Sequence, residues 1–187
     1  MLVLVGASAS GKTQLAKMLI KHHQFQKLVT TTTRPMRPGE VDGVDYHFLT
    51  YETFLALQEE GAFLEVTHYH DHWYGIQKQH VFHDSVVIVD PQGANVLKEQ
   101  LGDEAFIVFV NTAQAVRKSR MLKRGDEPNA VKERLALDEE HFAKEHFHVL
   151  DYTLVNNNTS LLKNAHHLAR VYRLNQKSNA PEDQQRD

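Results

Sequence analysis

The chain has 187 residues, no cysteine, 41% hydrophobic residues and a formal net charge of −3. This length fits one domain with room for a lid or a small subdomain. The lack of cysteine excludes disulfides and thiolate metal sites, and it suits a cytoplasmic protein. The slightly acidic balance offers no broad basic surface, so we expect no nucleic-acid partner. No apolar run is long enough for a membrane span, so we expect no membrane partner.

A phosphate-binding motif follows the first apolar run, Leu2–Val5, which predicts a buried strand. Gly6, four spacer residues, Gly11, Lys12 and Thr13 match the pattern G-x-x-x-x-G-K-[ST]. In this pattern the backbone N–H groups form a concave anion site, the lysine reaches the terminal phosphates, and the hydroxyl binds Mg²⁺. We therefore expect ATP and Mg²⁺ here. The loop residues expected to contact ATP are Gly6, Ala7, Ser8, Ala9, Ser10, Gly11, Lys12 and Thr13.

Helical and strand patterns alternate along the rest of the chain. Apolar residues at helical spacing predict helices over 14–20, 51–60, 91–100, 112–123 and 130–146, and a closing helix from Leu161. Apolar or alternating runs predict strands over 27–30, 62–67, 70–74, 85–90, 105–110 and 151–156. This alternation predicts an α/β fold with a parallel sheet covered by helices on both faces. Residues 175–187 are polar and predict a disordered tail.

The segment 30–48 is too rich in proline and glycine to form a helix. Arg34 and Arg37 lie three residues apart on a chain that Pro35 and Pro38 stiffen. Two guanidinium groups held on a rigid loop suit a phosphate dianion. A solvated basic loop is the alternative, and the phosphate-binding motif nearby favours the first interpretation.

Segment 30–48 resembles the nucleotide-monophosphate loop of guanylate kinases, and its spacing from the phosphate loop fits the same family. The resemblance extends from Leu2 to about Arg173. It implies a P-loop three-layer fold in one domain over residues 1–174. The core would comprise about 1–30, 84–120 and 145–174, with a small GMP-binding subdomain over about 31–83 and a helical lid over about 121–144.

The resemblance also implies an activity: in-line transfer of a phosphoryl group from ATP to GMP or dGMP with Mg²⁺. Glu65 corresponds to the carboxylate that accepts hydrogen bonds from N1–H and the exocyclic amine of guanine. Residues implied to bind the acceptor are Thr30, Arg34, Arg37, Glu40, Tyr46, Glu65, Tyr74, Gly75 and Asp90. Residues implied to act in catalysis are Lys12, Arg37, Arg124 and Arg134. Arg120 and Asn156 would contact ATP, and Asp90 would assist Thr13 at Mg²⁺, through water.

Two residues depart from the family pattern. Ile76 stands where the family has a second hydroxyl that contacts the base, so one neutral hydrogen bond of about 0.5–1.5 kcal/mol is missing. This loss predicts weaker GMP binding or an altered base preference. Ile88 replaces the first aspartate of the family's D-x-D, which leaves Asp90 as the remaining carboxylate.

Several alternatives stay open at this point. A noncatalytic guanylate-kinase-like binding module, or a kinase for another phosphorylated small molecule such as a ribose bisphosphate, would share many of these features. His68, His70 and His72 alternate along a strand and could converge on a metal, although solvent-facing histidines are the favoured interpretation. We expect a monomer or a homodimer.

Overall fold

The central sheet of this computed structural model, which describes residues 1–69 and 71–178, has strand order β2-β7-β1-β8-β9. Every neighbouring pair in it is parallel, as the alternating pattern predicted. At its centre Val3 of β1 pairs with Val87 of β7 and Ile107 of β8. The five strands are β1 (Leu2–Val5), β2 (Gln26–Lys27), β7 (Ser85–Ile88), β8 (Phe106–Asn111) and β9 (Tyr152–Val155).

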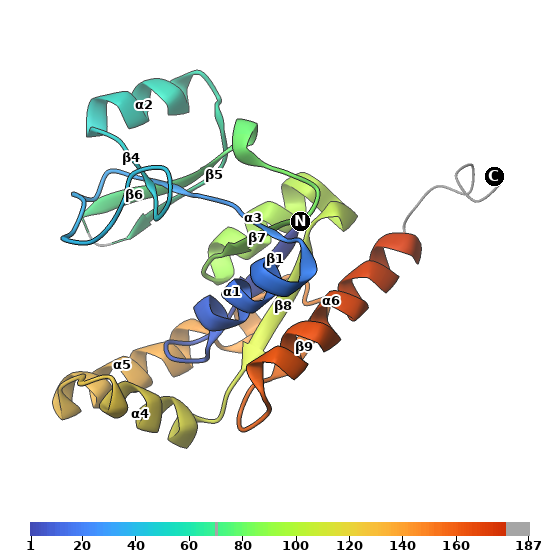
Figure 1. Cartoon of the computed structure of the whole chain (residues 1–187). Helices are drawn as coiled ribbons and strands as arrows, with labels where there is room; N and C mark the ends of the chain where they lie inside the picture. Colours follow the sequence, from blue (N-terminus) through green and yellow to red (C-terminus); the bar gives the residue numbers. More distant parts are fainter. Residues whose placement is uncertain (70, 179–187) are drawn as a thin grey trace.

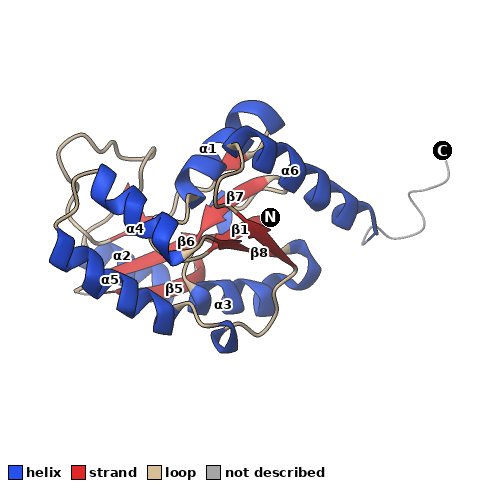
Figure 2. Ribbon diagram, turned by 90° about the horizontal axis from the view of Figure 1, so that it is seen from below, coloured by secondary structure: helices blue, strands red, loops and turns tan. Residues whose placement is uncertain are grey.

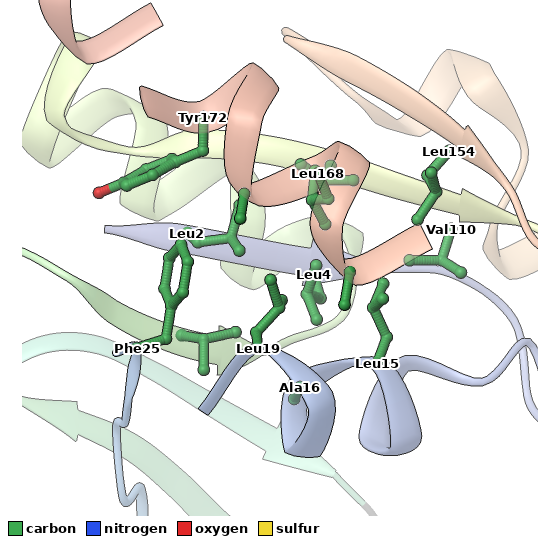
Figure 3. Packing of buried hydrophobic residues seen from close by; sticks show 14 of the residues in the cluster. Leu2, Leu4, Leu15, Ala16, Leu19, Phe25, Val110, Leu154, Leu168 and Tyr172 are labelled. Atoms are coloured by element: carbon green, nitrogen blue, oxygen red, sulfur yellow. The ribbon is translucent and has the colours of Figure 1, made fainter. Parts of the chain in front are cut away.

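Helices cover both faces of this sheet (Figure 2). Because side chains alternate along a strand, β1 supplies Leu2 and Leu4 to one hydrophobic cluster, and Val3 and Val5 to another. The first cluster lies under α1 and α6, where the strand side chains meet Leu15, Leu19, Leu168 and Tyr172 (Figure 3). The second lies under α3. The helices are α1 (Lys12–His23), α3 (Pro91–Leu101) and α6 (Leu161–Ser178).

The closing helix α6 is longer than the sequence pattern predicted. It continues through Asn175 to Ser178, so residues 175–178 are helical and do not belong to a disordered tail. Tyr172 is fully buried and fixes the helical turn that precedes these residues. Adding residues to a helix that is already formed costs little free energy, because each one gains a backbone hydrogen bond. The remainder of the predicted tail, 179–187, lies outside the described residues. Within the described residues, no helix has the length and apolar character of a membrane span.

A second, smaller sheet has strand order β4-β3-β6-β5. It is mixed: β6 pairs antiparallel with both β5 and β3, whereas β3 and β4 run parallel. The long connection between these two strands returns the chain in the same direction, as a parallel pair requires. The strand expected over 27–30 is wrong beyond its first residue, because β2 ends at Lys27, residues 28–30 belong to no strand, and β3 begins at Thr31. The elements are β3 (Thr31–Thr32), β4 (His47–Phe48), α2 (Tyr51–Glu59), β5 (Phe63–Tyr69) and β6 (His72–Gln77).

Helices α4 and α5 form a hairpin that lies against the phosphate loop. Met121, Val131 and Leu135 form their shared apolar cluster, and Ala9 of the loop packs on it. The second sheet and this hairpin extend from the same side of the core (Figures 1 and 2). The helical bounds are α4 (Gln114–Lys123) and α5 (Pro128–His141), with short 3-10 turns η1 (Lys78–His80), η2 (Gly102–Glu104) and η3 (Lys144–His146).

Candidate active site

The phosphate loop takes a backbone shape that its glycines permit. Gly6 has φ 148° and Gly11 has φ 100°, both in the region that favours glycine. A Cβ at Gly6 would lie 2.6 Å from the carbonyl oxygen of Val110, so a side chain there would collide with the neighbouring strand. Gly11 ends the loop and α1 begins at Lys12, so the positive end of the helix dipole faces the loop.

Two side chains support this loop from outside it. Arg120 donates from Nη1 to the carbonyl oxygens of Ala9 and Ser10, both at 3.1 Å. Its Nη2 reaches the carbonyl of Asn156 at 2.9 Å. The Asn156 side chain donates to the Ser10 carbonyl at 2.7 Å and accepts from Asn164 at 2.9 Å. Both residues therefore hold the loop in shape, and direct contact of Arg120 or Asn156 with a nucleotide stays a prediction.

Lys12 is turned into the loop. Its Nζ donates to the carbonyl oxygens of Gly6 and Ala7. Burial lowers the pKa of Lys12 to about 8; Asp138 nearby opposes this shift, and Arg117 and Arg134 add to it. An anion bound in the loop would favour the charged ammonium and raise this pKa again.

A carboxylate that the sequence interpretation missed reaches the same loop. Asp138 of α5 is buried, and its Oδ2 accepts from the backbone N–H of Ser8 at 2.8 Å and from Arg117 at 3.1 Å. Arg134 donates from Nε to the Ser8 hydroxyl at 2.9 Å. One sequence signal was available, since Asp138 continues the helical spacing of Val131 and Leu135, where an apolar residue is usual.

The proline-containing loop presents a buried guanidinium. Arg34 is 8% exposed and pairs with Glu40 at 2.7 Å. The Arg34 hydrogen bond, helped by the backbone N–H of Arg37, holds the pKa of Glu40 below its usual value. The guanidinium also lies 5.4 Å from the centre of the Tyr46 ring, which is cation–π range. The side chain of Arg37 is exposed at the rim of the same site.

A buried carboxylate of the second sheet, Glu65, also belongs to the site. Glu65 of β5 is 7% exposed, and burial raises its pKa to about 7. The hydroxyl of Thr67 donates to its Oε1 and opposes this rise, while Asp90 adds to it. Asp90 caps α3 by accepting the N–H of Gly93 at 2.8 Å. A Cβ at Gly93 would lie 3.3 Å from Glu65 Oε1, so the glycine leaves room for this carboxyl.

One cavity of about 960 Å³ joins these groups. The predicted site residues that line it are Gly6, Ser8, Lys12, Thr30, Arg34, Arg37, Glu40, Tyr46, Glu65, Tyr74, Gly75, Asp90 and Arg134. The predicted residues outside its lining are Ala7, Ala9, Ser10, Gly11, Thr13, Arg120, Arg124 and Asn156. Arg124 ends α4 in the exposed turn and pairs with Asp126, with Nε 2.6 Å from Oδ1. The cavity therefore brings Lys12 and the two arginines of the proline-containing loop to one space.

The two departures from the family pattern lie in different environments. Ile76 is fully buried in the hydrophobic cluster under α3 and does not line the cavity. Ile88 is 37% exposed and does line it.

The histidines considered as metal ligands are only partly within the described residues. His70 lies outside them, and the ring centre of His68 lies 4.8 Å from that of Trp73. Elsewhere in the described ranges, no three His, Cys, Asp or Glu side chains are grouped as metal ligands.

Comparison with known proteins decides the family. The family model described as guanylate kinase matches residues 1–174. The chain belongs to the guanylate kinase family. Its family places it among the nucleoside monophosphate kinases, which are phosphotransferases.

Individual guanylate kinases agree with this assignment. A guanylate kinase from Legionella pneumophila (strain Paris) is 35% identical over 162 residues, which cover 82% of this chain and 77% of that protein. The crystal structure of guanylate kinase from Anaplasma phagocytophilum matches with a TM-score of 0.68 and 26% identity, covering 94% of this chain and 85% of that one. A gluconokinase structure from Sinorhizobium meliloti 1021, at 16% identity and a TM-score of 0.53, shares the fold alone.

Proposed function

We propose that this guanylate kinase family member transfers a phosphoryl group from ATP to the phosphate of GMP or dGMP, with Mg²⁺. The observation that carries this proposal is the single cavity between the phosphate loop and the second sheet. Lys12 of the phosphate loop, Arg34 and Arg37 of the proline-containing loop and Glu65 of β5 all line it. A donor site and an acceptor site that share one space suit direct transfer between two bound nucleotides.

The acceptor side of the cavity offers groups for the phosphate and for the base of GMP. Arg34 and Arg37, with Tyr46 and Tyr74, would hold the acceptor phosphate, since arginine forks match phosphate oxygens. Ionised Glu65 would accept both N–H donors on the guanine edge, an arrangement that adenine does not offer. Thr30 lines the same cavity with a hydroxyl that would face the base.

The transfer itself needs positioning and charge neutralisation more than covalent chemistry. Lys12 and the loop amides would hold the phosphates of ATP. Arg134, which lines the cavity beside Ser8, would stabilise charge on the transferred group. Arg124 would join it after a rearrangement of the α4–α5 turn. The acceptor phosphate is already an anion, so no general base is required. Closure of the α4–α5 hairpin would exclude water.

The residues present fit a magnesium ion bound largely by phosphates and water. Thr13 is exposed on the first turn of α1, and Asp90, which lines the cavity, is partly exposed. Hard oxygen ligands of this kind suit Mg²⁺, which usually takes few of them from the protein. When bound, the ion would neutralise part of the charge on the phosphates. Thr13 would contact it directly and Asp90 through water.

An assay of ADP formation tests the proposed reaction. Purified chain with ATP and Mg²⁺ is given GMP, dGMP, AMP, IMP, CMP, UMP or a ribose bisphosphate in turn. We expect turnover with GMP and dGMP and little with the others. Turnover with only the ribose bisphosphate would contradict this proposal and would favour a kinase that acts on that phosphorylated sugar. Binding of ATP without turnover on any acceptor would favour a noncatalytic module.

Two further properties belong to the same proposal. The cysteine-free sequence fits the reducing cytoplasm, because the fold does not depend on a disulfide. A monomer or a homodimer is compatible with it, and sedimentation equilibrium would distinguish the two.

The Asp138→Asn variant is expected to bind ATP more tightly and to be less stable. The substitution removes the negative charge of the Asp138 carboxylate, which accepts a hydrogen bond from the backbone N–H of Ser8 in the phosphate loop. Because Asp138 also raises the pKa of Lys12, the rates are compared at a pH low enough to keep Lys12 charged. Under that condition, relief of about 1 kcal/mol of repulsion would lower KM for ATP about fivefold. The buried Arg117 loses its charged partner, at a cost of about 1–3 kcal/mol in the free energy of unfolding.

Initial rates and thermal melts check this prediction. Glu133→Gln is the matched control, because Glu133 carries the same charge on the exposed face of the same helix. An Asp138→Asn enzyme with a higher KM for ATP would show that the carboxylate assists the bound nucleotide and does not compete with it.

A further inference from the structure

A hydroxyl group lies directly beside the Glu65 carboxyl. Thr67 follows Glu65 by two residues on β5, so both side chains are on the same face of the strand. The Thr67 hydroxyl donates to Oε1 of Glu65. Both residues line the cavity assigned to the acceptor. Within the described part of the chain, no other side chain donates a hydrogen bond to this carboxylate.

The other neighbours of Glu65 do not stabilise a charge. Ile76 is its cross-strand partner on β6 and is fully buried, so this flank is apolar. Gly93 lies close to Oε1 and contributes no side chain. Asp90 is a second carboxylate facing the same space. The Thr67 hydroxyl is therefore the one side-chain donor, among the described residues, that stabilises the ionised Glu65 carboxylate in these surroundings.

These surroundings influence ionisation at neutral pH. Burial raises the pKa of Glu65 to about 7, the Thr67 hydrogen bond lowers it, and Asp90 raises it. Tyr74 on β6 and Asp90 at the N-cap of α3 line the same cavity from the elements packed against β5. Arg34, His141 and Lys12 line the cavity from other elements. Without the hydroxyl, a larger fraction of Glu65 would be protonated at pH 7.

We propose that Thr67 is a positioning residue for the acceptor base, because its hydroxyl fixes one oxygen of the Glu65 carboxylate. With Oε1 held by Thr67, the carboxylate plane is set against rotation. Both oxygens are then oriented to accept from the two N–H donors on the edge of guanine. This inference rests on the proposed function and adds to it the residue that prepares Glu65 for GMP.

The test compares Thr67→Val, which keeps the shape and removes the hydroxyl, with Thr67→Ser, which restores it. Thr153→Val is the matched control, since Thr153 is an exposed strand threonine on β9. Initial rates are measured with saturating ATP and varied GMP from pH 6 to pH 9. Calorimetry with GMP alone measures binding, and thermal melts verify folding. If Thr67→Val does not fold, Thr67→Ala takes its place against Thr67→Ser.

We expect Thr67→Val to raise KM for GMP about tenfold at pH 7, as loss of one hydrogen bond to a charged group predicts, with kcat nearly unchanged. Loss of a donor to the ionised form raises the pKa of Glu65. The acidic limb of the kcat/KM profile for GMP should therefore move to higher pH, and the deficit should shrink at pH 9. Thr67→Ser should follow the wild-type profile.

Other outcomes would overturn the inference. A Thr67→Val enzyme with the wild-type profile would show that the hydroxyl does not act on Glu65. A loss that is equal at every pH and is not rescued by serine would assign Thr67 a purely structural role. If the wild-type chain itself neither binds GMP nor turns it over, the proposed function fails together with this inference, and wild-type calorimetry distinguishes that case.

Discussion

The Lys12→Ala variant is expected to lose about 100- to 1,000-fold in kcat while keeping its fold, which is the usual cost of removing one donor that stabilises charge in a transition state. Nζ of Lys12 lies within the phosphate loop, where it donates to the carbonyls of Gly6 and Ala7. A triphosphate would receive this ammonium at its terminal phosphates. Rates at saturating ATP and GMP, with circular dichroism for the fold, provide the measurement.

Lys17→Ala is the control for this experiment, because Lys17 lies exposed on the same helix. Its rate should match the wild-type rate. A Lys12→Ala enzyme with an unchanged rate would contradict the role given to Lys12.

The pKa of Lys12 also predicts a pH effect. Because this pKa is about 8, the ammonium of the free enzyme loses its charge as the pH rises through that value. The kcat/KM for ATP should therefore decline above about pH 8.

The Glu65→Gln variant is expected to lose about 100-fold in kcat/KM for GMP, with a much smaller effect on KM for ATP. An amide offers one acceptor where the guanine edge needs two, and the negative charge is gone. A hydrogen bond to a charged group contributes about 1.5–3 kcal/mol, and each 1.4 kcal/mol corresponds to a tenfold change. Initial rates with GMP and with AMP measure the change, and the preference for GMP over AMP should narrow.

Glu59→Gln serves as the control, because Glu59 is an exposed carboxylate at the end of α2. It should leave both nucleotides' kinetics unchanged. A Glu65→Gln enzyme that retains the full preference for GMP would mean that another group reads the base. In that event Thr30 and Tyr74, which line the same cavity, would be the next residues to replace.

Local patterns were sufficient for the framework because their physics is local. A run of apolar residues such as Leu2–Val5, covered on both faces, predicted the central parallel strand, and the structure confirms it. The position of α1 followed from Gly11 and Lys12, since the loop motif ends where the helix begins. Boundaries followed less closely from local patterns: α6 continues to Ser178, and residues 28–30 connect β2 of the central sheet to β3 of the second sheet instead of extending a strand.

The sequence alone determined the phosphate loop from Gly6 to Thr13, the alternating α/β fold and the resemblance to guanylate kinases, because closely spaced residues encode each of them. Only the tertiary structure decided which side chains surround that loop. Asp138 reaches Ser8 across 130 residues of sequence, and Arg120 turns to the carbonyls of Ala9 and Ser10. Such contacts depend on how α4 and α5 pack against the loop, and no local pattern encodes that packing.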